Sequence, residues 1–339
     1  MPSMQNLPAE ILHSIARFVG SDHFQAHPDT LLLFKNWWHE ARIVAYEELS
    51  LTLDKIEKYL EAPQSIRHLV KTSNTNLTVS LTGNFEGEVF APECVDRTME
   101  TLASLASQLK RMHRMNGFTL RIFIFLNMVP AYDAGLMPMM ISSLLEDLPR
   151  SLSRLTIDCY NGYPMSQGQT IEAECPSSLL LNKVFVPSLR HLRFRSRFIC
   201  PKIFDPFCSS AESQLESLII NTSQRVEQSW PPMDKVFFSE ECHGDYIGRG
   251  SGDLCTKLKD AANAKLPQLT RIKVLRILRH KHPSDDVLSY DVLSDRTVIL
   301  PENADWEDAE CHNAGEADPD CEERSENSFS SSNSDDDSE

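Results

Sequence analysis

Apolar residues near the beginning of the chain recur at the spacing of a helix. Five of them define a first helical run: Leu7, Ile11, Leu12, Ile15 and Phe18. Pro8 suits the first turn of this helix, because that turn needs no backbone donor from it. Gly20 is a typical helix stop, and a polar loop is expected from Ser21 to Pro28.

A second helical run is predicted from about Leu31, and it is apolar on more than one side. Its apolar residues are Leu31, Leu32, Phe34, Trp37, Trp38, Ala41, Ile43 and Val44. A single apolar stripe is what a helix needs to pack against one neighbour. The additional apolar surface therefore indicates that this part of the chain needs a partner to cover it.

Farther along, short segments with a common apolar pattern are predicted to be strands. Four of them carry apolar residues at their first, fourth and sixth positions, and they begin at Leu152, Leu189, Leu215 and Leu269. The alternation from Leu120 to Leu126 predicts another strand of the same set. The segment from Ile66 to Leu69 is expected to open an earlier and weaker unit.

Helical patterns lie between several of these strands. Helices are expected over Val95–Met115, over Leu136–Leu148 and close to Leu254–Ala262, so the fold class is α/β. The strand motifs start 37, 26 and 54 residues apart, whereas regular leucine-rich repeats span about 20–29 residues. We therefore expect an irregular leucine-rich-repeat-like solenoid with insertions. The alternative is an ordinary α/β domain whose strands happen to follow prolines.

Most of the negative charge is concentrated at the end of the chain. The 339 residues carry a net charge of −16, and residues 301–339 hold 15 acidic residues and one arginine, which leaves −2 for residues 1–300. The acidic, serine-rich tail is expected to be disordered, because it has few apolar groups to bury. Binding to nucleic acid is disfavoured, since it requires a concentrated positive field. The predicted domains are residues 1–50, 51–300 and 301–339.

The distribution of apolar residues and cysteines bears on the cellular compartment. No stretch reaches the roughly 18 consecutive apolar residues of a membrane span, and the first residues do not resemble a secretory signal. The nine cysteines include no Cys-x-x-Cys pair, which favours reduced thiols. We therefore expect a protein of the cytoplasm or the nucleus that does not interact with membranes.

Motifs of enzyme chemistry are not found in the sequence. The pairs Cys242-His243 and Cys311-His312 do not have the spacing of metal ligands. The stretch Gly248–Gly252 lacks the lysine of a phosphate-binding loop. No Gly-x-Ser-x-Gly nucleophile motif occurs. We therefore predict no catalytic residue, metal or cofactor, although a hydrolase with a divergent site stays an alternative.

The beginning of the chain resembles an F-box. The matching residues run from Met4 to Leu51 and comprise Leu7-Pro8-Ala9-Glu10-Ile11-Leu12, then Ile15 and Phe18, then Leu31-Leu32-Leu33-Phe34, and finally Trp37-Trp38 and Tyr46. With the repeat-like domain that follows, the whole chain looks like a fungal F-box protein with a degenerate leucine-rich-repeat-like C-terminal domain.

This resemblance implies a function in ubiquitin ligation without chemistry by the chain itself. An F-box docks on the Skp-type adaptor of an SCF-type cullin-RING ubiquitin ligase, and the C-terminal domain presents a protein substrate. The residues expected to contact the adaptor are Leu7, Pro8, Ile11, Leu12, Ile15, Leu31, Leu32 and Trp37. Two alternatives stay open, which are a self-contained helical core at these positions and a protein-interaction scaffold outside any ligase.

A substrate surface is predicted from the strand pattern. In each predicted strand the residues between the apolar positions project to the open face of the sheet. The basic residues expected on or beside this face are Arg190, Arg193, Arg195, Arg271 and Lys273. We therefore predict a basic groove for an acidic or phosphorylated protein. The alternative is a solvated face, or one neutralised by the acidic tail.

Overall fold

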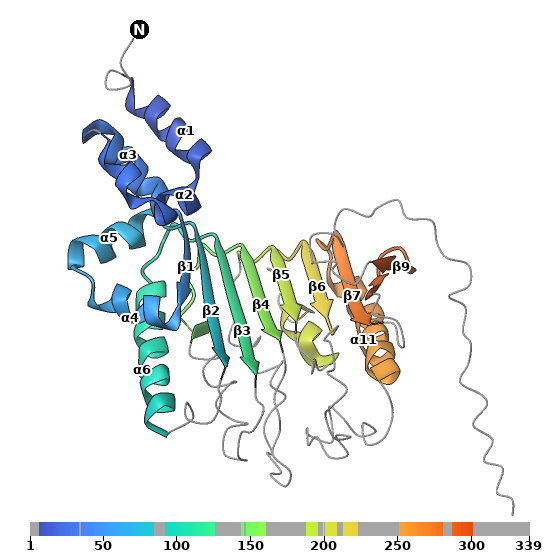
Figure 1. Cartoon of the computed structure of the whole chain (residues 1–339). Coiled ribbons are helices and arrows are strands. Elements are labelled where there is room, and N and C mark those ends of the chain that lie inside the picture. Colours follow the sequence, from blue (N-terminus) through green and yellow to red (C-terminus); the bar gives the residue numbers. More distant parts are fainter. Residues whose placement is uncertain are drawn as a thin grey trace, which may run out of the picture.

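The computed structural model of the chain describes residues 7–33, 35–84, 92–125, 144–145, 147–160, 188–195, 199, 201–208, 213–222, 251–280 and 287–300 (Figure 1). Several sequence predictions concern residues outside these ranges. They are the acidic tail, most of the helix expected over Leu136–Leu148, the two Cys-His pairs and the first three residues of the glycine-rich stretch Gly248–Gly252.

Short helices form an N-terminal unit, called here the helical module. They are α1 (Ala9–Val19), α2 (Ser21–Ala26), the 3₁₀ helix η2 (Pro28–Leu32) and α3 (Lys35–Ala45). The Pro8 carbonyl begins α1 by accepting the N–H groups of Ile11 and Leu12, at 3.1 Å each. The helix ends at Gly20, whose φ of 89° is readily adopted by glycine. The predicted limits of this helix are confirmed.

The loop predicted from Ser21 to Pro28 is wrong, because α2 occupies most of it. The reason is Phe24, the one aromatic residue in this polar stretch. Its ring is buried and packs edge-on against Trp37, with ring centroids 5.8 Å apart. That contact joins two segments that are distant along the chain, so local composition gives no sign of it.

Within the described residues, nine strands form one open sheet in chain order. They are β1 (Glu48–Thr52), β2 (Asn76–Asn84), β3 (Gly117–Phe125), β4 (Arg154–Tyr160), β5 (His191–Arg195), β6 (Ser217–Asn221), β7 (Val274–His280), β8 (Val287–Asp291) and β9 (Arg296–Leu300). Neighbours from β1 to β7 are parallel, and β8 and β9 are antiparallel additions. The expected α/β class is confirmed in this form. The helical module lies beyond β1, at the opposite end of the sheet from β9 (Figure 1).

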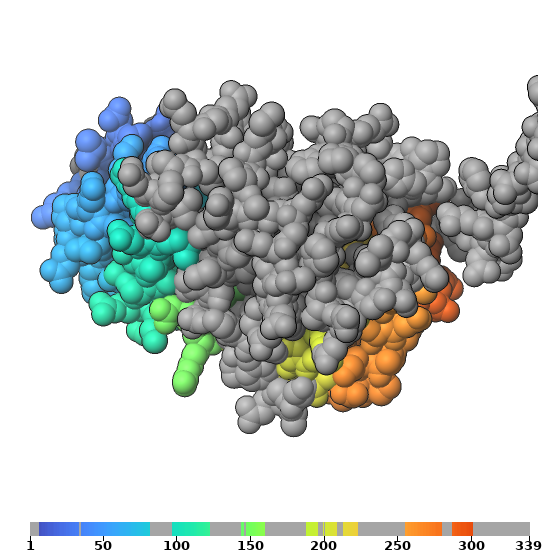
Figure 2. Space-filling model, turned by 90° about the horizontal axis from the view of Figure 1, so that it is seen from below, coloured from blue at the N-terminus to red at the C-terminus, as the bar shows by residue number. Residues whose placement is uncertain are grey.

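The crossover helices bury their apolar residues against one face of the sheet, here the inner face. They are α4 (Leu53–Glu61), α5 (Gln64–Ser73), α6 (Pro92–Leu109), η4 (Pro201–Phe204), α9 (Asp205–Cys208), α11 (Ser251–Lys265) and η5 (Leu266–Gln268). The helices α6 and α11 confirm two sequence predictions, and they lie at opposite ends of the molecule (Figure 2). The prediction that Ile66–Leu69 opens an earlier unit of the strand set is wrong, because Ile66 and Leu69 belong to the helix α5.

Successive parallel strands begin with the same backbone hydrogen bonds. The carbonyl just before one strand accepts the N–H groups of two consecutive residues at the start of the next, as Glu47 does from Thr75 and Asn76 at 2.8 and 3.0 Å. The other acceptors are Thr75, Asn116, Ser153, Arg190 and Glu216. The strands therefore stay aligned at their amino ends although the connections between them differ in length.

The apolar strand motif occurs at each of these parallel strands. Its first positions are Tyr46, Asn74, Met115, Leu152, Leu189, Leu215 and Ile272, each two residues before a strand. The motif predicted at Leu269 is therefore displaced by three residues, since β7 begins at Val274. Before β2 the first motif position is the polar residue Asn74, so the apolar pattern alone does not predict this strand. Asn74 is fully buried, and its Nδ2 donates to the carbonyls of Tyr46, Glu47 and Asn76.

Candidate functional site

The helical module has a core of its own and also exposes apolar side chains. Its core consists of Leu12, Ala16, Phe24, Trp37, Ala41, Val44 and Ala45. On α1, Leu12 faces this core, whereas Ile11 is 48% exposed and Phe18 is almost fully exposed. Leu32, 71% exposed, and Leu33 add to this surface from η2 and the residue after it. Of the eight large apolar side chains that are exposed among the described residues, six belong to this module. The exposed surface of the module is therefore a candidate docking surface.

The eight predicted adaptor contacts are divided by burial into three groups. Pro8, Ile11 and Leu32 are exposed, Leu7, Ile15 and Leu31 are partly buried against the module core, and Leu12 and Trp37 are buried. Trp37 also donates from its Nε1 to the Thr30 carbonyl at 2.7 Å. Leu12 and Trp37 therefore hold the module together, and the other six are within reach of another molecule.

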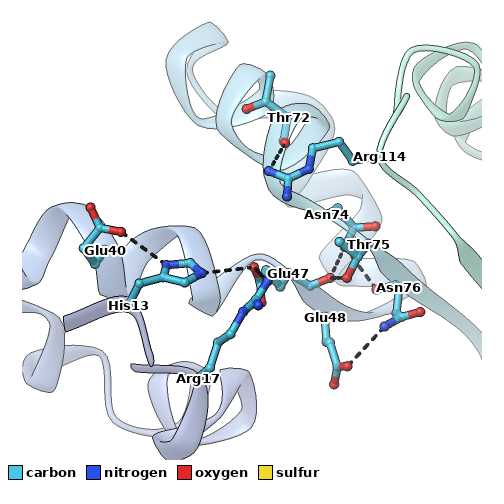
Figure 3. A network of polar contacts seen from close by, with 10 residues as sticks. All are labelled: His13, Arg17, Glu40, Glu47, Glu48, Thr72, Asn74, Thr75, Asn76 and Arg114. Atoms are coloured by element: carbon cyan, nitrogen blue, oxygen red, sulfur yellow. Dashed lines mark hydrogen bonds and ion pairs between the residues drawn. The ribbon is translucent and has the colours of Figure 1, made fainter. Parts of the chain in front are cut away.

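A polar network joins the helical module to the sheet (Figure 3). Arg17 on α1 donates two hydrogen bonds to the Glu47 carboxylate, at 3.1 and 2.8 Å, and this contact raises the pKa of Arg17. His13 lies between two carboxylates, 3.2 Å from Glu40 and 3.8 Å from Glu47. Because the Glu47 carbonyl also binds the start of β2, this one residue links α1 to two strands.

The outer face of the sheet forms a groove of about 660 Å³ across the amino-terminal ends of β1 to β5. Its floor is a row of hydroxyl groups on adjacent strands, Ser50, Thr78, Thr119 and Thr156, and this row continues to Arg193. Asp22 from α2 also lines the groove. Both the helical module and the sheet therefore contribute to this cavity.

Three side chains form a chain of hydrogen bonds along the edge of the groove. Asn76 donates from Nδ2 to Glu48 Oε1 at 3.1 Å and accepts at Oδ1 from Arg154 Nη2 at 3.0 Å. Between Asn76 and Arg154, on β3, stands Gly117. A Cβ atom at Gly117 would overlap Asn76 Oδ1, so the absence of a side chain lets Arg154 reach across a whole strand.

Three of the predicted substrate-binding cations lie outside the strands. Arg190, Arg271 and Lys273 precede β5 and β7 at the amino edge of the sheet. Lys273 and Arg190 both contact Glu216, at 2.6 and 3.6 Å, and the hydrogen bond from Lys273 lowers the pKa of that carboxyl group. Arg271 donates to the Gln214 side chain. The structure therefore gathers these three cations around the start of β6 rather than in the groove.

The other two predicted cations lie on the outer face of β5. Arg195 forms a two-fold contact with Asp158 on β4, with both nitrogen–oxygen distances at 2.6 Å. Asp158 is buried, so the contact with Arg195 compensates for the hydration that its carboxylate loses. Arg193 lines the groove two residues earlier. Sequence reasoning missed Asp22, Glu48 and Arg154 in the groove, because their proximity depends on strand register and on the packing of α2 beside β1.

The cysteines and acidic residues described here offer little for redox or metal chemistry. Burial raises the pKa of Cys159 to about 12 and raises that of Cys255 as well, so neither thiol is ionised near neutral pH. Across the described ranges, no three His, Cys, Asp or Glu side chains come together as a metal site. Likewise, no described helix combines the length and apolar character needed to cross a bilayer.

Comparisons with known proteins do not assign the chain to a family. No family model matches it, and no curated protein matches it. Among solved structures, a crystal structure of a Bacteroides fragilis protein is similar to this chain. The match covers 53% of this chain and 43% of the Bacteroides protein, with 14% sequence identity and a TM-score of 0.28. The matched region is thus less than half of that protein, and a likeness at this level carries no functional argument.

Proposed function

We propose that this chain is the substrate-recognition subunit of an SCF-type cullin-RING ubiquitin ligase. In this proposal the helical module is an F-box that docks on a Skp-type adaptor, and through it on the cullin and RING subunits. The sheet is an irregular repeat-type domain that presents a protein substrate in the cytoplasm or the nucleus. The chain itself performs no chemistry, because tethering supplies the rate advantage by raising the effective concentration of the substrate.

The main support is the exposed apolar surface of the helical module. Ile11, Phe18, Leu32 and Leu33 are exposed although the module already has a closed core. Burying such side chains against another protein is worth about 25 cal/mol for each Å² of apolar surface removed from water. The F-box resemblance falls on the same residues, since Ile11, Leu32 and Leu33 belong to its matching segments.

The substrate-binding part of the proposal is supported by the sheet. Seven parallel strands run in chain order, and the described crossover helices pack on one face, while the other face carries the groove over β1 to β5. Stacked units of this kind offer extended surfaces for binding proteins. The network around Glu47 fixes the module against β1, so an adaptor on the module would be held at a defined place relative to the groove.

Co-purification of the adaptor tests the docking role. We expect the double variant Ile11→Glu, Leu32→Glu to lose the Skp-type adaptor, the cullin and the RING subunit, because two charges would be buried in an apolar interface. The matched control is Leu293→Glu, which charges another exposed leucine at the far end of the sheet. Circular dichroism and thermal unfolding should be unchanged in both variants.

The same experiment separates the two functional alternatives. Retention of all three ligase subunits by the double variant would overturn the proposed docking surface. Recovery of other proteins from the native cell, without cullin or RING subunits in the wild-type sample, would instead support a protein-interaction scaffold.

A further inference from the structure

The groove carries opposite charges at its two ends. Asp22 and Glu48 lie at the end formed by α2 and β1, and Arg154, His191 and Arg193 lie at the end formed by β4 and β5. Among the ion pairs of the described residues, none involves Asp22 or Glu48, and none joins Arg154 to a carboxylate. The basic groove expected from the sequence is therefore, in the structure, a groove with two zones.

An amide keeps these two zones apart. Asn76 binds Glu48 with its Nδ2 and Arg154 with its Oδ1, so it contacts both charged groups without neutralising either. A direct contact between Glu48 and Arg154 would cancel the two charges. Since the Asn76 amide is neutral and both charged residues are exposed, each zone can still bind a ligand group of opposite charge.

The separation of the zones sets the size of the ligand. Glu48 and Arg154 approach each other through Asn76, so their charged groups are about 8 Å apart or less, the span of two hydrogen bonds and one amide. The strand β5, which carries His191 and Arg193, lies about 19 Å from β1, since neighbouring strands are about 4.8 Å apart. The floor between them, Ser50, Thr78, Thr119 and Thr156, has hydroxyl groups that can donate and accept hydrogen bonds. An extended peptide covers about 8 to 19 Å in about three to six residues, at about 3.3 Å per residue.

We propose that the groove binds an extended peptide segment with a basic residue at one end and an acidic or phosphorylated residue about three to six positions away. This inference rests on the proposed role of the groove as the substrate site and specifies the class of substrate. A nucleic acid would bring phosphates to the Asp22 and Glu48 end, where like charges repel them.

Fluorescence anisotropy with two labelled peptides at low salt tests the inference. Both are Gly-Ser peptides; the dipolar probe has two lysines and two glutamates separated by five residues, and the acidic probe has glutamates at both places. The wild-type chain should bind the dipolar probe about fivefold more tightly, or better, because it gains contacts at both ends. The variant Asp22→Lys, Glu48→Lys should reverse this order and prefer the acidic probe.

Matched variants distinguish local recognition from a change in net charge. The control Asp54→Lys, Glu61→Lys alters the net charge equally, at exposed positions of α4 on the opposite face of the sheet, and should keep the wild-type order. The milder variant Asp22→Asn, Glu48→Gln should abolish the preference without reversing it.

Equal binding of both probes by the wild type, or a reversal of order in the α4 control, would overturn the inference. The groove variants should retain the adaptor in co-purification. Failure of the peptide test with the adaptor still bound therefore refutes the charge zones alone, whereas loss of adaptor binding by the wild-type chain refutes the proposed function.

Discussion

Gly117 matters because of the side chain it lacks. The Glu48–Asn76–Arg154 chain of hydrogen bonds crosses β3 directly above this residue. The sequence shows a glycine before an alternating strand, which by itself indicates only a strand boundary. Its effect on the groove depends on neighbours 41 and 37 residues away along the chain, Asn76 and Arg154, and so could not be predicted.

We expect Gly117→Ala to break this chain of hydrogen bonds. The added methyl group would overlap Asn76 Oδ1, and the amide would have to rotate away. The clash is with the end of a flexible side chain, so the free energy of unfolding should change by no more than about 1 kcal/mol. Urea unfolding measures this change, and binding of the dipolar probe should weaken.

A double-mutant cycle with Asn76→Ala checks the cause. In the Asn76→Ala background, Gly117→Ala should have no further effect on probe binding, because both substitutions remove the same contacts. Additive losses would show that Gly117 acts in some other way.

At the scale of elements, local patterns predicted the existence of a strand better than they predicted its first and last residues. The motifs at Leu152, Leu189 and Leu215 are in the register that the structure adopts. The fourth was misplaced because two overlapping apolar patterns, starting at Leu269 and Ile272, both fit. The choice between them is made by hydrogen bonds from Lys273 and Val274 to Glu216, on a neighbouring part of the sheet.

One ion pair joins β4 to β5 across the outer face of the sheet. Asp158 and Arg195 are directly opposite each other in the register, and Asp158 is buried. We expect Asp158→Ala to lower the free energy of unfolding by about 3 kcal/mol, because it leaves the guanidinium without its carboxylate. Thermal or urea unfolding measures this.

The control is Thr156→Ala, two residues earlier on the same face of β4, where the side chain is only partly buried. This substitution should change stability by less than about 1 kcal/mol. Similar losses in the two variants would mean that the strand, and not the ion pair, is sensitive to substitution.

At the scale of the whole molecule, the described residues build separate apolar clusters in the helical module and under the sheet. The sequence indicated an N-terminal helical unit with surplus apolar surface. It could not indicate which side of α1 becomes core, since Leu12 and Ile11 are equally apolar neighbours. Packing against Trp37 and Phe24 makes that choice.

The thiol of Cys159 should report on the integrity of the large core. Burial raises the pKa of Cys159 to about 12, so at pH 8 only about one thiol in ten thousand is a reactive thiolate. We expect iodoacetamide to alkylate Cys159 at least about tenfold more slowly than the half-buried Cys208. Peptide mapping by mass spectrometry measures both sites in one sample.

In concentrated urea the two cysteines should react at similar rates, which serves as the control. Equal rates in the native protein would contradict the burial of Cys159, and with it the closed core beneath β4.

The sequence by itself determined the limits of α1, the α/β class and the strands β3 to β6, because these depend on the spacing of apolar residues over a few turns or pleats. Only the tertiary structure decided the helix at Ser21, the start of β7, the buried place of Leu12 and the lining of the groove. Each of these depends on which distant segments lie next to one another. Strand register brings Glu48 and Arg154 to one cavity, and the packing of α2 adds Asp22. Register is a property of pairs of segments, not of any one of them.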